Sequence, residues 1–382
     1  MKSVLDDALE RLRHTGPEEA DGAPNHGPMA AEALVALGCE DAVPQWVDAY
    51  RRQLGPMPET RLPVTTETWR DALGSRRRVG DWVVFFRLQL SAASWQTVLT
   101  AWLLRLIPGV MAHGTHGLIR TAHAVRALEE AETSLRVEEL AAALGYWAAY
   151  YQELPGVPHL TGTCAIDQAL DQLPRLGRDY DWRVTPPEFV RGLDTHPDFP
   201  RAVDAIAAPK TIAEALGTLT EVGARLYLTQ ASRYPLIFIH AVTGPVALRR
   251  LLPHLSTAMQ HTAFAYVWQA VAAWTAAFGS PAPIAAWPDD VPPVAASEIV
   301  AQSVDTRDPH AIKFAEACLQ EYRLNPRPVY LRAALDWPTR LHTSLRQRSA
   351  GRMAAGITGR WDPTAQPPSE SCEQTGREGA QG

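Results

Sequence analysis

The sequence predicts an all-α protein that forms one large, irregular multi-helical domain. Apolar residues make up 46% of the 382 residues, which is enough for a sizeable core. They recur at the three- and four-residue spacing of a helix through most of the chain. No series of alternating apolar and polar residues indicates a sheet. The segment DWVVFF at 81–86 is the best strand candidate, and it fits the start of a buried helix equally well.

Each expected helix rests on this spacing together with start and stop signals. The first, over 3–13, places its five apolar residues on one stripe. The second begins after Pro28, a start signal, and ends at Gly38, a stop signal. The same spacing predicts helices over 68–74, 94–109, 118–131, 137–154, 211–232, 246–255, 262–279 and 309–324.

The predicted domain spans residues 1–348, and a C-terminal tail follows at 349–382. The tail is rich in Gly, Ser, Gln and Glu and has few apolar residues to bury, so we expect disorder. The net charge is -6 and no basic stripe is present, which argues against a nucleic-acid partner. The apolar runs are too short to span a bilayer, the first residues do not resemble a signal peptide, and the four cysteines are scattered. We therefore expect a cytoplasmic protein with no membrane partner.

Four of the twelve histidines lie beside helix-start signals, namely His26, His116, His240 and His310. Imidazole is the commonest protein ligand for iron, copper and zinc. Several imidazoles that point inward from separate helices can form a metal site in the interior of a helical domain. Taken singly, each of the four also fits an ordinary histidine at a helix end. Familiar metal, nucleotide and serine-hydrolase motifs, such as HExxH, GxGxxG and GxSxG, are absent from the sequence.

A lysine in the segment DPHAIKFAEA stands out because the chain is dominated by arginine. The 36 cationic side chains include three lysines, Lys2, Lys210 and Lys313. Arginine stays charged, whereas a buried lysine can lose its proton and act as a neutral amine. Such an amine can add carbon dioxide and become an anionic carbamate with two oxygen donors. The alternative is a lysine whose stem covers apolar surface and whose charged end reaches water.

Four segments, taken together, resemble the signature segments of the questin oxidase-like family. They are NHGPMAAEAL, HGLIRTAHAVRAL, HAVTGPVALR and DPHAIKFAEACL, and they occur in the family's order between residue 25 and about residue 320. The family is mostly helical and acts in the tailoring of aromatic polyketides, including ring opening of anthraquinones and Baeyer–Villiger-type oxygen insertion. Some members are non-haem iron oxygenases whose metal is bound by four histidines and a carboxylated lysine.

Carried over segment by segment, the resemblance implies a set of ligands for Fe(2+), namely His26, His116, His240, His310 and Lys313. His261 and His123 could each take the place of His310 as the fourth imidazole. Arg120 stands where some relatives have a histidine. Arg120 and His123 are the candidate catalytic residues, and Arg120 is suited to pair with a phenolate or carboxylate of the substrate.

The resemblance thus implies an oxygenase that uses dioxygen and a small aromatic substrate in an apolar pocket. Candidate pocket walls are Trp82, Tyr266, Trp268 and Trp147, although each also fits plain helix packing. One alternative is a Baeyer–Villiger-type monooxygenase that takes NADPH as an external reductant, since no nucleotide-binding motif is present. The sequence is also compatible with a helical metal-dependent hydrolase and with a helical binding protein that has no enzymatic activity.

Overall fold

The computed structural model describes residues 3–176, 192–194, 196–230, 234–288 and 294–357. The chain divides into two compact units, Met1–Thr339 and Arg340–Gly382. Everything that follows concerns the first unit, apart from the last part of the final helix. The tail predicted from residue 349 begins inside that helix, which extends to Ile357, and the remainder of the tail lies outside the described residues.

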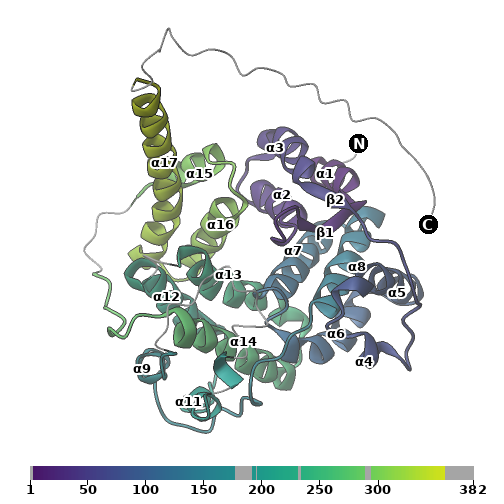
Figure 1. The fold of residues 1–382 in the computed structure, drawn as a ribbon. Coiled ribbons are helices and arrows are strands. Elements are labelled where there is room, and N and C mark those ends of the chain that lie inside the picture. The colour runs from purple at the N-terminus through teal and green to yellow at the C-terminus, as the bar shows by residue number, and fades with distance from the viewer. Residues whose placement is uncertain (1–2, 177–191, 195, 231–233, 289–293, 358–382) are drawn as a thin grey trace, which may run out of the picture. The chain divides into compact units, whose positions relative to one another are not determined.

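The regular structure of the described residues is almost entirely helical, as predicted, with short 3-10 turns, two small strands and irregular loops between the helices (Figure 1). The strands β1 (Thr15–Glu19) and β2 (Leu54–Pro56) pair in an antiparallel sheet. The helices are α1 (Val4–Leu12), α2 (Gly27–Ala36), α3 (Val43–Tyr50), α4 (Trp69–Ala72), α5 (Val79–Ala92), α6 (Trp95–Leu106), α7 (His116–Glu130), α8 (Ser134–Ala149), α9 (Ile166–Gln172), α11 (Phe199–Val203), α12 (Ile212–Gln230), α13 (Pro235–Leu251), α14 (Thr257–Phe278), α15 (Ala296–Asp305), α16 (Pro309–Leu324) and α17 (Pro328–Ile357).

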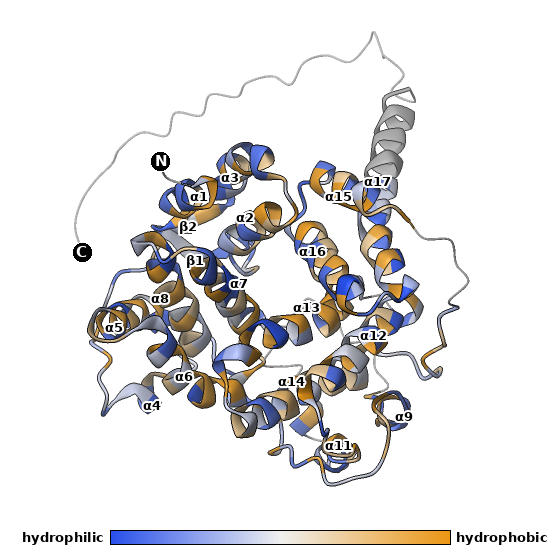
Figure 2. Ribbon diagram, turned by 180° about the vertical axis from the view of Figure 1, so that it is seen from behind, coloured by the Kyte–Doolittle hydropathy of each residue, from blue (hydrophilic) through white to orange (hydrophobic). Residues whose placement is uncertain are grey.

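Local sequence explains most of these boundaries. Ser3 caps α1 by accepting a hydrogen bond from the amide of Asp6, and Asp308 caps α16 in the same way. The DWVVFF segment lies within α5, so the helical alternative for this segment is the right one. In Figure 2, α1 alternates hydrophobic and hydrophilic residues, and its apolar face is buried.

The sequence placed the start of one central helix too late. The Gly-Pro pair at 244–245 indicated a start near Val246, but α13 begins at Pro235 and Pro245 lies in its interior. Proline removes one backbone donor and leaves the carbonyl of Ala241 without its helical partner. Gly223 of α12 approaches that carbonyl so closely that a Cβ at this position would clash with it. The close packing of α12 on α13 therefore keeps α13 helical through the Gly-Pro pair, which by itself would indicate a helix start.

Four helices, α2, α7, α13 and α16, contact one another in a closed circle, with α7 touching α13, α13 touching α16, α16 touching α2 and α2 touching α7. In Figure 1 they surround the middle of the first unit. Among the described residues, the segment Pro235–His254 is the one helix long and apolar enough to cross a membrane, but 67% of its apolar window is buried. A core helix has the same length and composition.

Candidate metal centre

The four predicted histidines come from the four helices of this circle. His26 immediately precedes α2, His116 is the first residue of α7, and His310 lies in the first turn of α16. His240 lies in the second turn of α13 and not at a helix start. All four imidazoles nevertheless meet, with ring centroids 4.4 Å apart for His26 and His310 and 4.6 Å apart for His116 and His240.

Three of the imidazoles are oriented by oxygen atoms at Nδ1. The Nδ1 of His116 lies 2.7 Å from the backbone oxygen of His113, and that of His240 lies 2.7 Å from the backbone oxygen of Leu236. The Nδ1 of His26 lies 3.0 Å from Oε1 of Glu19. A carbonyl or carboxylate oxygen accepts, so each Nδ1 bears the proton and each Nε2 presents a lone pair.

These lone pairs point at one another. The Nε2 of His116 lies 3.0 Å from Nε2 of His26 and 3.3 Å from Nε2 of His240. His26, His116 and His310 offer ring nitrogens that all lie within 4.8 Å of one another. Two nitrogens at about 2.1 Å from one metal ion and at right angles to each other would lie about 3.0 Å apart. The donor atoms and their spacing therefore fit a single transition-metal ion.

Burial keeps these imidazoles neutral. It lowers the pKa of His240 to about 3, and it holds the pKa of His26, His116 and His310 well below the ordinary value. The positive charge of Lys313 and the neighbouring imidazoles lower these pKa values further. Neutral imidazole is the form that binds metals.

Lys313 lies one turn after His310 on α16 and is buried, with 3% of its surface exposed. Burial lowers the pKa of its amine to about 7, although the carboxylates of Asp308 and Glu19 oppose the shift. Its charge affects the pKa of all four imidazoles, which places it within electrostatic reach of each. The sequence alternative, a lysine whose charged end reaches water, does not match this burial.

The turn before His116 is strained. His113, Gly114 and Thr115 have φ of 46°, 69° and 70°, the left-handed region that favours glycine. Non-glycine residues in this conformation cost about 1–3 kcal/mol each and occur preferentially at functional sites. The turn directs the carbonyl of His113 toward Nδ1 of His116. The hydroxyl of Tyr146 donates to Nδ1 of His113 over 2.8 Å, which fixes that side chain.

A cavity of about 440 Å³ opens beside the imidazoles, within the 300–1,000 Å³ range of small-molecule sites. One wall holds the four histidines and His113. The rest is largely apolar and is lined by Tyr234, Leu236, Ile237, Trp274 and Trp337. No carboxylate lines the cavity among the described residues.

None of the predicted pocket walls lines this cavity. Trp82 is buried against Phe86 and Trp102, and its indole donates to the carbonyl of Ala72. The indoles of Trp268 and Trp147 likewise donate to backbone carbonyls, and neither they nor the half-buried Tyr266 line the cavity. Buried tryptophans need a partner for the indole N–H, and the core satisfies them without a ligand.

The two predicted catalytic residues also have other partners. The guanidinium of Arg120 donates two hydrogen bonds to Glu139, at 2.7 and 2.9 Å, and the side chain does not line the cavity. His123 bonds to Glu32 over 2.5 Å in a separate buried cluster. Both residues are therefore satisfied within the protein. His261, the remaining candidate for the fourth imidazole, is half-buried in the first turns of α14 and does not line the cavity.

Sequence reasoning missed the residues that support the site. Glu19 belongs to β1 and receives a hydrogen bond from Tyr50 of α3 over 2.5 Å. The same hydroxyl accepts from the amide of His26 over 2.7 Å. No motif links these positions, because they meet through the pairing of two short strands and the packing of α3.

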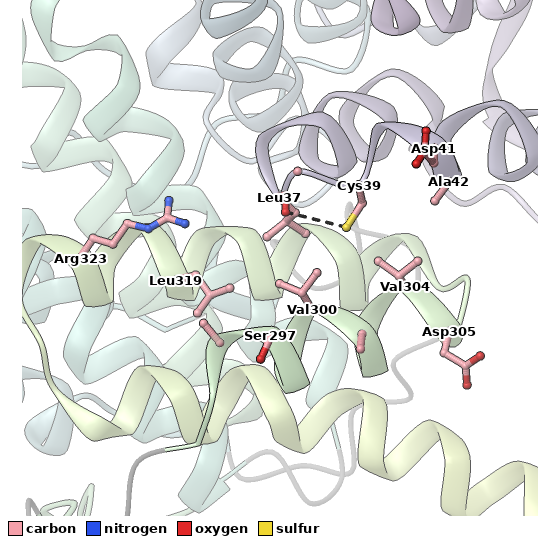
Figure 3. A pocket seen from close by; sticks show the side chains of 13 residues that line it. Leu37, Cys39, Asp41, Ala42, Ser297, Val300, Val304, Asp305, Leu319 and Arg323 are labelled. Carbon is pink, nitrogen blue, oxygen red and sulfur yellow. Dashed lines mark hydrogen bonds between the residues drawn. The ribbon is translucent and has the colours of Figure 1, made fainter.

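A second hollow lies between the end of α2, α15 and α16 (Figure 3). Its floor is apolar, with Val300, Val304 and Leu319, and Asp41 and Arg323 are among its polar residues. It contains no histidine, and it differs from the cavity beside the imidazoles in lacking a convergent set of donors.

No family profile matches the chain, and no curated protein matches it in sequence. The resemblance to the questin oxidase-like family therefore stays a prediction that rests on the four quoted segments.

Proposed function

We propose that the protein is a non-haem iron-dependent oxygenase that acts with dioxygen on an aromatic, anthraquinone-like polyketide. The observation that supports this most is the convergence of neutral imidazoles at the wall of an apolar cavity, where the Nε2 atom of His116 lies 3.0 Å from that of His26 and 3.3 Å from that of His240. Imidazole suits iron, copper, nickel and zinc alike. The choice of iron and of the substrate class rests on the resemblance alone.

The proposed ligands are His26, His116, His240, His310 and Lys313. A neutral Lys313 amine adds to carbon dioxide, forming an N–C bond and releasing one proton, and the product is a carbamate anion. With its pKa near 7, a large share of this amine is neutral at neutral pH. The carbamate places a negative charge beside four imidazoles, which favours a bound cation.

Bound iron(II) supplies the redox chemistry with dioxygen that carbon–carbon cleavage or oxygen insertion requires. The chain contributes the positioning of these donors and a largely apolar cavity. Glu19 and the carbonyls of His113 and Leu236 keep each Nε2 lone pair directed inward. Trp274 and Trp337 give flat apolar walls on which a polycyclic aromatic ring can lie.

Two other reactions are compatible with the same donors. A monooxygenase of the Baeyer–Villiger type would need NADPH as an external reductant. A metal-dependent hydrolase usually pairs its metal with a carboxylate as general base, and the described lining of the cavity contains none. This difference favours the oxygenase.

The test is oxygen uptake by metal-free protein reloaded anaerobically with iron(II), zinc or no metal, with an anthraquinone as substrate. We expect substrate-dependent uptake with iron alone. His26→Ala should abolish it, and His261→Ala, outside the cluster, should retain it. NADPH-dependent uptake would favour the monooxygenase, whereas equal uptake with iron, zinc and no metal would refute the iron-dependent oxygenase.

A further inference from the structure

A second buried polar cluster spans the same four helices as the imidazoles. We call it the ion ring and define it as Glu32, His123, Arg126, Arg250 and Glu316. Each of the four helices contributes to it: Glu32 comes from α2, His123 and Arg126 from α7, Arg250 from α13 and Glu316 from α16.

The contacts of the ion ring close on themselves. Arg126 donates to Glu32 and, over 2.5 Å, to Glu316. Arg250 donates to Glu316 and lies 3.4 Å from Nε2 of His123. Nδ1 of His123 donates to Glu32 over 2.5 Å, which closes the loop of contacts. These contacts link α7 to α2, α13 and α16, and they link α13 to α16.

The ring is balanced in charge and in hydrogen bonds. Two carboxylates face two guanidiniums, and burial lowers the pKa of His123 to about 4, so this imidazole is neutral. Burial alone would raise the pKa of Glu32, but the hydrogen bond from His123 and the charge of Arg126 lower it to about 2. Neutral His123 donates through Nδ1 and accepts at Nε2, which matches its two partners.

On each of the four helices, a ring residue follows the histidine of the imidazole cluster at a set spacing. The spacing is the same for α2 and α16, and the same for α7 and α13. The glutamates Glu32 and Glu316 each follow their helix's histidine by six residues. The arginines Arg126 and Arg250 each follow theirs by ten residues. At 1.5 Å per residue these offsets are about 9 and 15 Å along the helix axes. A helix that slid along its axis would break the ring and displace its imidazole by the same amount.

We propose that the ion ring sets the axial register of the four helices, so that Glu32, Arg126, Arg250 and Glu316 are positioning residues of the metal centre. The inference rests on the proposed metal site. Buried ion pairs seldom stabilise a fold more than well-packed apolar residues do, and fixing a register is their best-attested use. Second-layer groups of metal sites typically affect metal affinity 10- to 100-fold.

The chain offers a matched control on two of the same helices. Arg249 of α13 donates to Glu321 of α16 over 2.6 and 3.0 Å, and Glu321 is fully buried. This pair ties α13 to α16 without belonging to the ring. Glu316→Gln and Glu321→Gln therefore remove the same charge from the same helix, and both should lower the melting temperature.

The test is the affinity of full-length, metal-free protein for cobalt(II), read from its visible absorption and from calorimetry. We expect Glu316→Gln to weaken cobalt binding at least about tenfold, and Glu321→Gln to stay within about twofold of wild type. If Glu316→Gln does not fold, Arg250→Lys takes its place as a milder variant, because it keeps the charge but not the forked geometry. We expect Arg250→Lys to lose cobalt affinity severalfold.

Equal affinities for Glu316→Gln and wild type would overturn the role of the ring while leaving the metal site standing. An equal loss in Glu316→Gln and Glu321→Gln would reduce the ring to an ordinary stabilising contact. A wild-type protein that binds no cobalt would overturn the metal site itself, and the inference with it.

Discussion

The imidazole cluster and the ion ring lie on the same four helices and are both buried, yet their electrostatics are opposite. In the ion ring each donor meets an acceptor and the charges cancel. In the imidazole cluster the lone pairs of His26, His116 and His240 face one another, and Lys313 adds a positive charge. The turn before His116 adds three left-handed residues, whereas no residue of the ring has a positive φ.

The difference separates a region whose polar groups are satisfied within the protein from one whose donor atoms face one another. Natural sequences satisfy buried polar groups almost everywhere, and the exceptions concentrate at functional sites. The facing Nε2 lone pairs repel one another, and a cation bound between them would be coordinated by all of them. The two regions should therefore differ in how mutation affects the metal-free protein: ring variants should lose stability as well as metal affinity, whereas cluster variants should lose metal affinity with little change in stability.

The largest expected effect is on the ring. Glu32→Ala leaves His123 and part of Arg126 buried without their carboxylate, and we expect it to lower the free energy of unfolding by about 3–5 kcal/mol. Glu138→Ala, which breaks a partly exposed pair with Arg87, should cost about 1 kcal/mol or less. Urea denaturation of the metal-free proteins measures both. Equal losses would remove the contrast between the ring and an ordinary surface pair.

Next in size is the replacement of the cluster's lysine. Lys313→Arg keeps a positive charge but cannot form a carbamate, so we expect metal-dependent activity to fall at least about 100-fold. Lys313→Glu should retain part of the metal, and a small carboxylic acid should partly restore Lys313→Ala. Lys210→Arg, at an exposed lysine, should be silent. Iron content and oxygen uptake are the readouts, and a fully active Lys313→Arg protein would end the carbamate proposal.

A smaller effect concerns pH. Burial depresses the pKa of His240 to about 3 and of His123 to about 4, below the ordinary 6.5. Between these values and 6.5 the unfolded chain binds more protons than the folded one, so stability rises with pH across this window. We expect metal-free protein to gain unfolding free energy from about pH 4 to 6.5, and His240→Gln to gain less. A flat profile would mean that these imidazoles are charged or exposed.

The smallest expected effect lies at the C-terminus. Deletion from Gly351 onward removes few apolar residues, so stability should change by less than about 0.5 kcal/mol and activity should persist. Thermal denaturation and oxygen uptake measure this. A large fall in melting temperature would show that the deleted segment packs on the domain.

The sequence revealed more of the imidazole cluster than of the cavity beside it. Helix starts marked His26, His116 and His310, and the scarcity of lysine marked Lys313, because these are local signals. The position of His240 within α13 and the support from Glu19 depend on how distant elements pack, which no local pattern encodes. The partner of Arg120 was not predicted for the same reason, since Glu139 is on another helix.

The central claim is that the facing lone pairs belong to a metal centre, and metal analysis after anaerobic purification tests it most directly. We predict about one iron ion per chain in the wild type, and none in His116→Ala, because His116 faces both His26 and His240. His254→Ala, outside the cluster, is the control and should keep the ion. A wild-type protein without metal, or full iron occupancy in His116→Ala, would contradict the account.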